Sequence, residues 1–234
     1  MRFLVALFLT IAASFAAENP SYDRGIAALK AGASAEAVKE FTEAIKAQPS
    51  YADAYYRRGD AYESLGEPQK ALRDYAQAIR INPNHAQAYN DRGVIYKNAG
   101  DFKKAIADYT QALQIDPKFA AAYNNRGVAY ANLNDHETAI TDLTHAIRAD
   151  PSYAAAYVNR GYSRHQLGDL KKALADYAQA IKINPSYAAA YANRVAVYLE
   201  SGDLKSATKD AKKACDLGDC KALTLMTNEK FLQD

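Results

Sequence analysis

The sequence has no tryptophan, only two cysteines and four histidines, and no excess of charge of either sign. The few Cys and His residues lack the spacing of zinc ligands, so we expect no metal site. The chain also lacks a Gly-rich phosphate loop, a nucleophile elbow and a paired-histidine helix, so we expect neither catalysis nor a cofactor. Lys and Arg number 29 against 27 Asp and Glu, and this balance disfavours a nucleic-acid partner.

Long apolar runs are confined to the N-terminus. Arg2 precedes an apolar stretch over residues 3–13, and Ser14-Phe15-Ala16 places small residues where a signal peptidase recognises them. The stretch is too short to span a bilayer, which takes about 20 apolar residues. We therefore predict a signal peptide over residues 1–16, export to the bacterial periplasm or the extracellular medium, and no membrane insertion after cleavage. An uncleaved N-terminal anchor is the alternative.

Proline and tyrosine, by contrast, recur with one period. Five of the seven prolines stand 34 residues apart, at Pro49, Pro83, Pro117, Pro151 and Pro185. The same spacing relates a series of Arg-Gly pairs, two columns of alanine and most of the 18 tyrosines. A fixed period of this length predicts a repeat array rather than conventional globular domains.

Each period predicts two helices. In residues 86–119, apolar and small residues recur at helical spacing up to Gly100-Asp101, where Gly ends one helix and Asp caps the next. The second helix is predicted over residues 102–115, because the residue before Pro117 avoids the helical conformation. Gly93 and Ala105 are small, so the two antiparallel helices can pack closely, with tyrosines beside the contact. Stacked pairs of this kind bury one continuous core.

From Ser21 to Asp219, the sequence resembles the tetratricopeptide repeat (TPR) family. The resemblance rests on the 34-residue period, on the Gly-Asp turn, and on the order of aromatic, Gly, aromatic, Ala, aromatic, Ala and Pro within each period. The resemblance implies an all-α fold, a right-handed α-solenoid of antiparallel helix pairs with about six units. We expect a degenerate N-terminal unit over residues 17–51, five tandem units over 52–221 and a capping helix within 222–234. The later units depart from the family pattern at Arg164, Val195 and Ala211.

Two polar columns accompany this pattern. An Arg stands just before the Gly column, and an acidic residue follows each Arg after 16 residues, from Arg24 and Glu40 to Arg194 and Asp210. In an antiparallel helix pair, the two residues stand at about the same height. We predict an Arg–carboxylate pair within each unit, with bidentate geometry. An Arg ladder for an anionic ligand is the alternative.

An asparagine column precedes the Arg column in three successive units, at Asn125, Asn159 and Asn193. The resemblance implies that first helices line a concave groove, where some family members bind a peptide backbone through a ladder of Asn. An amide donates and accepts, so it can pair with peptide N–H and C=O groups; a solvated or helix-capping Asn is the alternative. The predicted groove residues are Tyr56, Arg57, Asn90, Asp91, Lys97, Asn124, Asn125, Asn159, Tyr162, His165 and Asn193, with Asp60, Asn132, Gln166 and Glu200 nearby.

The two cysteines, Cys215 and Cys220, flank a short turn after the last predicted helix pair. In an oxidising compartment we predict a disulfide between them, with free thiols or a redox or metal role as alternatives. A final helix is predicted over residues 221–232, where Ala222, Leu225 and Met226 can cover the end of the array.

These patterns favour a non-enzymatic scaffold that binds a protein or peptide in its groove. A structural or self-associating module that uses its ends or convex face is the alternative. Neither the partner's identity nor the oligomeric state follows from the sequence.

Overall fold

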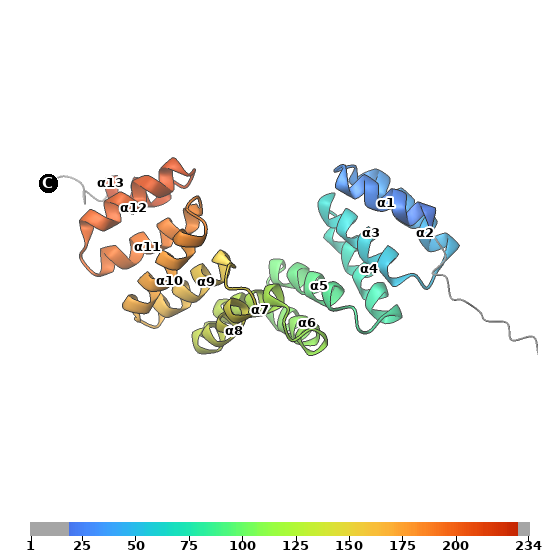
Figure 1. Cartoon of the computed structure of the whole chain (residues 1–234), viewed down its shortest axis with the longest axis horizontal. Coiled ribbons are helices and arrows are strands. Elements are labelled where there is room, and N and C mark those ends of the chain that lie inside the picture. Colours follow the sequence, from blue (N-terminus) through green and yellow to red (C-terminus); the bar gives the residue numbers. More distant parts are fainter. Residues whose placement is uncertain (1–18, 229–234) are drawn as a thin grey trace, which may run out of the picture. The chain divides into compact units, whose positions relative to one another are not determined.

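The computed structural model describes residues 19–228, so the predicted signal segment 1–16 lies outside the described residues. This range holds thirteen helices and no strand, and the predicted all-α helical-repeat solenoid is confirmed (Figure 1). The described residues divide into two compact units, with the boundary between Ile81 and Asn82. We describe each unit by itself.

The first unit consists of two helix pairs that follow one another along the chain. In each pair the two helices pack together, and the second helix of the first pair packs on the first helix of the next. The helices are α1 (Pro20–Lys30), α2 (Ser34–Ala47), α3 (Ala52–Ser64) and α4 (Pro68–Ile81).

The second unit repeats this pairing four times and ends with a single helix that packs on α11 and α12. The final helix is described to Asn228, so the predicted remainder of it up to residue 232 lies outside the described residues. The helices are α5 (Ala86–Asn98), α6 (Phe102–Ile115), α7 (Ala120–Asn132), α8 (His136–Ala149), α9 (Ala154–Gln166), α10 (Leu170–Ile183), α11 (Ala188–Glu200), α12 (Leu204–Asp216) and α13 (Lys221–Asn228).

The turn inside each pair follows the predicted chemistry. Gly100 has a φ of 79°, and the Asp101 carboxylate accepts the backbone N–H of Lys104 at 3.1 Å to cap α6. At the corresponding turn between α7 and α8, Asn134 takes a φ of 62°, since Asn tolerates the left-handed conformation better than most residues. The predicted Gly-Asp turn is thus confirmed.

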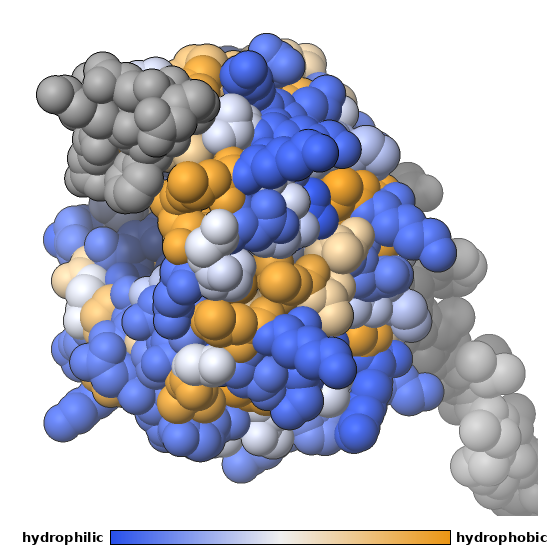
Figure 2. Space-filling model, turned by 90° about the vertical axis from the view of Figure 1, so that its left-hand side faces the viewer, coloured by the Kyte–Doolittle hydropathy of each residue, from blue (hydrophilic) through white to orange (hydrophobic). Residues whose placement is uncertain are grey.

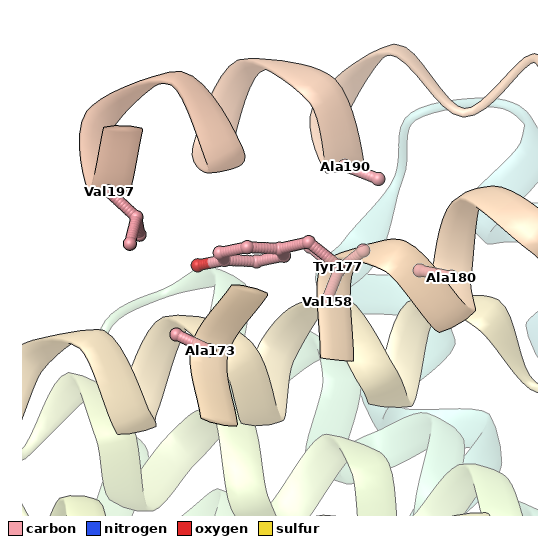
Figure 3. Packing of buried hydrophobic residues seen from close by; sticks show 6 residues of the cluster. All are labelled: Val158, Ala173, Tyr177, Ala180, Ala190 and Val197. Atoms are coloured by element: carbon pink, nitrogen blue, oxygen red, sulfur yellow. The ribbon is translucent and has the colours of Figure 1, made fainter. Parts of the chain in front are cut away.

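Close packing of small residues against aromatic rings holds each pair together. A Cβ atom built on Gly161 of α9 would lie 2.8 Å from Cε1 of Tyr177 on α10. The Tyr177 ring is fully buried and lies between α9, α10 and α11, close to Val158 and Val197 (Figure 3). The predicted packing role of the aromatic column is confirmed, and any side chain larger than Gly at this point must displace the ring.

The predicted Arg–carboxylate pairs are also present. Arg92 donates from Nε and Nη2 to the two oxygens of Asp108 at 2.8 and 2.7 Å, and the five aspartates of this column are buried. Hydrogen bonding to Asp108 raises the pKa of Arg92. Four further pairs are bidentate, whereas Arg24 reaches a single oxygen of Glu40. The four are Arg58–Asp74, Arg126–Asp142, Arg160–Asp176 and Arg194–Asp210.

Candidate functional site

The first helices of the second unit share one face. Helix α5 contacts α7, α7 contacts α9, and α9 contacts α11, whereas α6, α8, α10 and α12 do not pack on one another in this way within residues 82–228. The helices that approach one another lie on the inner side of a curved stack. We call the surface of α5, α7, α9 and α11 the first-helix face.

The asparagine column ties neighbouring first helices together on this face. Asn125 on α7 donates from Nδ2 to Oδ1 of Asn90 on α5 at 3.1 Å. One repeat further on, Asn159 on α9 donates from Nδ2 to Oδ1 of Asn124 on α7 at 2.9 Å. Each bond spans 35 residues in sequence and fixes the orientation of a column side chain. One Nδ2 hydrogen of each of these two amides is therefore used within the protein, while the second hydrogen and the Oδ1 lone pairs can be offered to a ligand.

Three of the predicted groove residues are buried. Asn90 and Asn124 are each 6% exposed, because they accept the bonds from the next helix, and Tyr56 is 9% exposed with its ring 5.7 Å from that of Tyr75. Burial leaves little of these three side chains for a partner to contact, and their role in the groove stays a prediction. Arg57 lies on α3 in the first unit and donates to Asp60 at 3.0 Å.

The other predicted residues give the first-helix face charges of both signs. Asp91 on α5 accepts from Nδ2 of Asn90 at 2.9 Å, and Lys97 is half-buried near the end of the same helix. His165 on α9 lies 2.7 Å from Glu200 on α11, measured from Nε2 to Oε2. This third cross-helix contact again joins neighbouring first helices.

A cavity of about 400 Å³ opens beside Asn159 and Tyr162. Its walls come from α7, α8, α9 and the turn after α7. Asn132, Asn159 and Tyr162 are among the groove residues that the sequence predicts, whereas the α7–α8 turn and α8 are not predicted to contribute. The sequence feature that could have indicated this cavity is Leu143, because the same column is aromatic in the preceding units. The lining residues are Val128, Ala131, Asn132, Asn134, Leu143, Asn159 and Tyr162.

A second, more apolar cavity of about 340 Å³ lies at the C-terminal end, between α11 and α13. Asn193, the last residue of the asparagine column, lines it together with Leu199 and Leu225. Leu225 is 60% exposed. Figure 2 views this end of the molecule, where apolar patches alternate with hydrophilic surface.

The cysteines lie at the junction of α12 and α13. The structure joins Cys215 and Cys220 in a disulfide across the turn that separates these helices. In the described part of the chain, no His, Cys, Asp and Glu side chains form a group of three or more that could hold a metal. None of the helices between residues 19 and 228 combines the length and apolar character needed to cross a membrane.

Comparison with protein families assigns the repeats. One sequence model described as a tetratricopeptide repeat matches residues 22–86, and a second matches 86–119, 120–153 and 154–187. Together the matches cover more than half of the chain. No curated protein matches the sequence.

Solved structures share the fold. PilW, a type IV pilus biogenesis factor, is similar with a TM-score of 0.79 and 18% identity over 89% of this chain and 97% of that one. YrrB, a TPR protein with an unusual peptide-binding site, is similar with a TM-score of 0.65 and 23% identity over 81% of this chain and 97% of that one. A chain of the APC/C hetero-tetramer Cut9–Hcn1 is similar with a TM-score of 0.76 and 19% identity over 88% of this chain. The match spans 42% of the length of that chain.

Proposed function

The chain belongs to the tetratricopeptide repeat family, and we propose that it is a non-enzymatic scaffold that binds a protein or peptide partner along the first-helix face. Asn125, Asn159 and Asn193 hold the backbone of an extended segment of that partner. The observation that carries this proposal is the recurrence of Asn at 34-residue spacing on three successive first helices. YrrB, a neighbour of the same fold, is itself a peptide-binding TPR protein.

The fixed orientation of the column suits backbone recognition. The bonds from Asn125 to Asn90 and from Asn159 to Asn124 occupy one donor of each of these two column amides. Each Oδ1 accepts a peptide N–H, and the second Nδ2 hydrogen is available for a peptide C=O. Because these side chains are already ordered, binding costs little of their conformational entropy. Recognition of this kind depends on the backbone and tolerates many ligand sequences.

A matched set of variants tests the ladder. We expect random peptides displayed on phage to yield ligands for the purified protein, and the triple variant N125A/N159A/N193A to bind them about a hundredfold more weakly, since three hydrogen bonds are lost. The control N90A/N124A breaks the same two cross-helix bonds from the buried side and leaves the column in place. It should retain most of the affinity. Equal losses in both variants, or no ligand at all, would contradict the proposal.

Self-association is a second candidate function, and the C-terminal cavity favours it. Apolar side chains of α11 and α13 line this cavity, and Leu225 at its edge is largely exposed. An end of this kind can receive a second copy of the chain. Sedimentation equilibrium would show a concentration-dependent mass that is lost in Leu225→Ser. A single monomeric mass at all concentrations would rule this candidate out.

We also propose that the protein is exported, after cleavage following Ala16, to the periplasm or, as the alternative, the extracellular medium. The N-terminal segment and the pairing of Cys215 with Cys220 support this, because disulfides persist in oxidising compartments. N-terminal sequencing of protein from the periplasmic fraction should begin at Ala17, and thiol alkylation should need prior reduction. An intact Met1 would instead indicate an uncleaved anchor.

A further inference from the structure

The cavity beside Asn159 lies where the repeat pattern is interrupted. Leu143 on α8 stands in the column that holds Phe41, Tyr75, Tyr109 and Tyr177 in four of the other units, at multiples of the 34-residue period. Gly127 faces Leu143 in the same way as Gly161 faces Tyr177. The surroundings of an aromatic ring are thus retained in this unit, whereas the ring itself is absent.

The structure shows where the tip of the ring would lie. In the first unit, the hydroxyl of Tyr75 lies 3.0 Å from Oδ1 of Asp60 and 2.6 Å from Oε2 of Glu63. Two periods of 34 residues further on, the positions of Asp60 and Glu63 are held by Val128 and Ala131. Both residues line the cavity. The cavity therefore occupies the place that a tyrosine tip fills in another unit.

The walls of the cavity combine an aromatic ring with amide groups. Tyr162 on α9 is 44% exposed, and its ring meets the ring of His136 edge-on, with centroids 6.1 Å apart. The corresponding residues on neighbouring first helices are aliphatic. Asn132, Asn134 and Asn159 supply amide donors and acceptors around the opening. A ring with one polar atom matches such a wall better than a purely apolar group does.

Two buried polar side chains adjoin the Tyr162 wall. His136 and Ser163 take the positions that Phe102 and Ala129 hold one repeat earlier, where both residues belong to an apolar cluster. Nδ1 of His136 and Oγ of Ser163 are buried and have no hydrogen-bond partner within residues 19–228. Replacing apolar residues by unpartnered polar ones costs stability. Two such replacements next to Tyr162 favour a polar ligand at this cavity.

We propose that this cavity binds a tyrosine side chain of the peptide held on the first-helix face, and this proposal rests on the proposed function. The ring of the ligand enters the space left by Leu143 and packs on Tyr162, while its hydroxyl bonds to the surrounding amides. Because Asn159 belongs both to the asparagine column and to the cavity wall, the tyrosine is set in register with the bound backbone. The cavity thus adds side-chain specificity to a backbone ladder.

Small amides test the cavity without a known ligand. The probes are N-acetyltyrosinamide, N-acetylphenylalaninamide and N-acetylalaninamide, titrated into the isotope-labelled full protein and followed by NMR. We expect saturable shifts at Val128, Ala131 and Tyr162 with the tyrosine amide, about fivefold weaker binding of the phenylalanine amide because one hydrogen bond is lost, and none of these shifts with the alanine amide. Absence of site-specific shifts with the tyrosine amide would overturn the proposal.

Variants that restore the repeat pattern provide the controls. Leu143→Tyr refills the space with the column's usual residue opposite Gly127, so it should fold and should abolish the shifts. Leu143→Met conserves volume and should retain them. Tyr162→Val introduces the residue found at the corresponding positions 94 and 128, and should weaken binding while keeping the helix intact. Unchanged binding in Leu143→Tyr or in Tyr162→Val would contradict the proposal.

The same variants separate this inference from the proposed function. If peptides selected by phage display lose affinity for N125A/N159A/N193A and yet bind Leu143→Tyr as tightly as the unmodified protein, the tyrosine site is refuted and the proposed groove is left intact. If the library yields no ligand, the groove is refuted, and the titration with the tyrosine amide still decides the cavity.

Discussion

The fifth helix pair, α9 and α10, and the last pair, α11 and α12, place the small and the large residue of their contact on opposite helices. In the fifth pair, Gly161 on α9 leaves room for the fully buried ring of Tyr177 on α10. In the last pair, Val195 stands in the Gly column and Ala211 in the aromatic column, and both are buried. The larger residue of the contact thus lies on the first helix of the last pair and on the second helix of the fifth pair. The two departures from the family pattern therefore compensate one another.

The remaining space in the last pair is filled from outside the pair. Met226 on α13 is 1% exposed and packs against Val195, Ala207 and Ala211. In the fifth pair, the corresponding ring is covered instead by α11, through Ala190 and Val197 (Figure 3). The comparison shows that an internal pair depends on the next repeat, whereas the last pair is closed by a short terminal helix.

The largest difference between the two pairs should follow removal of the buried carboxylate. Asp176 accepts from Arg160 at 3.0 and 2.7 Å and from Arg164 at 2.8 Å, whereas Asp210 accepts from Arg194 alone among residues 19–228. Asp176→Ala leaves two guanidinium groups uncompensated and should lower the free energy of unfolding by about 4 kcal/mol, measured by urea denaturation. Asp210→Ala serves as the control and should cost less. A larger loss in Asp210→Ala would contradict this reasoning.

Gly161→Val should cost about 3 kcal/mol in the free energy of unfolding, because the new side chain collides with a ring that has no free space. The double variant Gly161→Val/Tyr177→Ala copies the last pair and should recover part of that loss. A double-mutant cycle by thermal denaturation measures the coupling. Additive losses would show that the two columns do not compensate one another.

Met226→Ala should lower the free energy of unfolding by about 2 kcal/mol and expose α13 to hydrogen exchange, since a buried side chain is lost. Leu225→Ala lies next to it but removes an exposed side chain, so it should change stability little. Equal effects of the two substitutions would mean that α13 does not close the last pair in solution.

The smallest effect concerns the tyrosine hydroxyl. Burial raises the pKa of Tyr177 above its ordinary value of 10.0, so the folded state keeps the phenol neutral. The stability that depends on this neutral form is present below pH 10 and is lost as pH rises through the folded pKa. Ultraviolet titration should show one fewer late-ionising tyrosine in Tyr177→Phe. At neutral pH this variant should match or exceed the unmodified protein in stability, because the hydroxyl has no hydrogen-bond partner in the described residues.

Much of this architecture was predictable because it repeats. The 34-residue period predicts the helix positions, the Gly100-Asp101 turn and the Arg92–Asp108 pair, because the same spacing recurs from unit to unit. The orientation of Asn90 and Asn124 was not predictable, since adjacent residues on a helix point in different directions and only packing decides which is covered. The compensation at Val195 and the cavity at Leu143 depend on side-chain volumes from three helices, which spacing alone does not describe. In both cases a departure from the column was the visible signal.

Side-chain amide NMR tests directly whether the asparagine column binds a peptide backbone. During titration with a peptide selected by phage display, the Nδ2 signals of Asn125, Asn159 and Asn193 should shift together and saturate with the affinity measured by calorimetry. Tight binding that leaves these three signals unmoved would contradict the account.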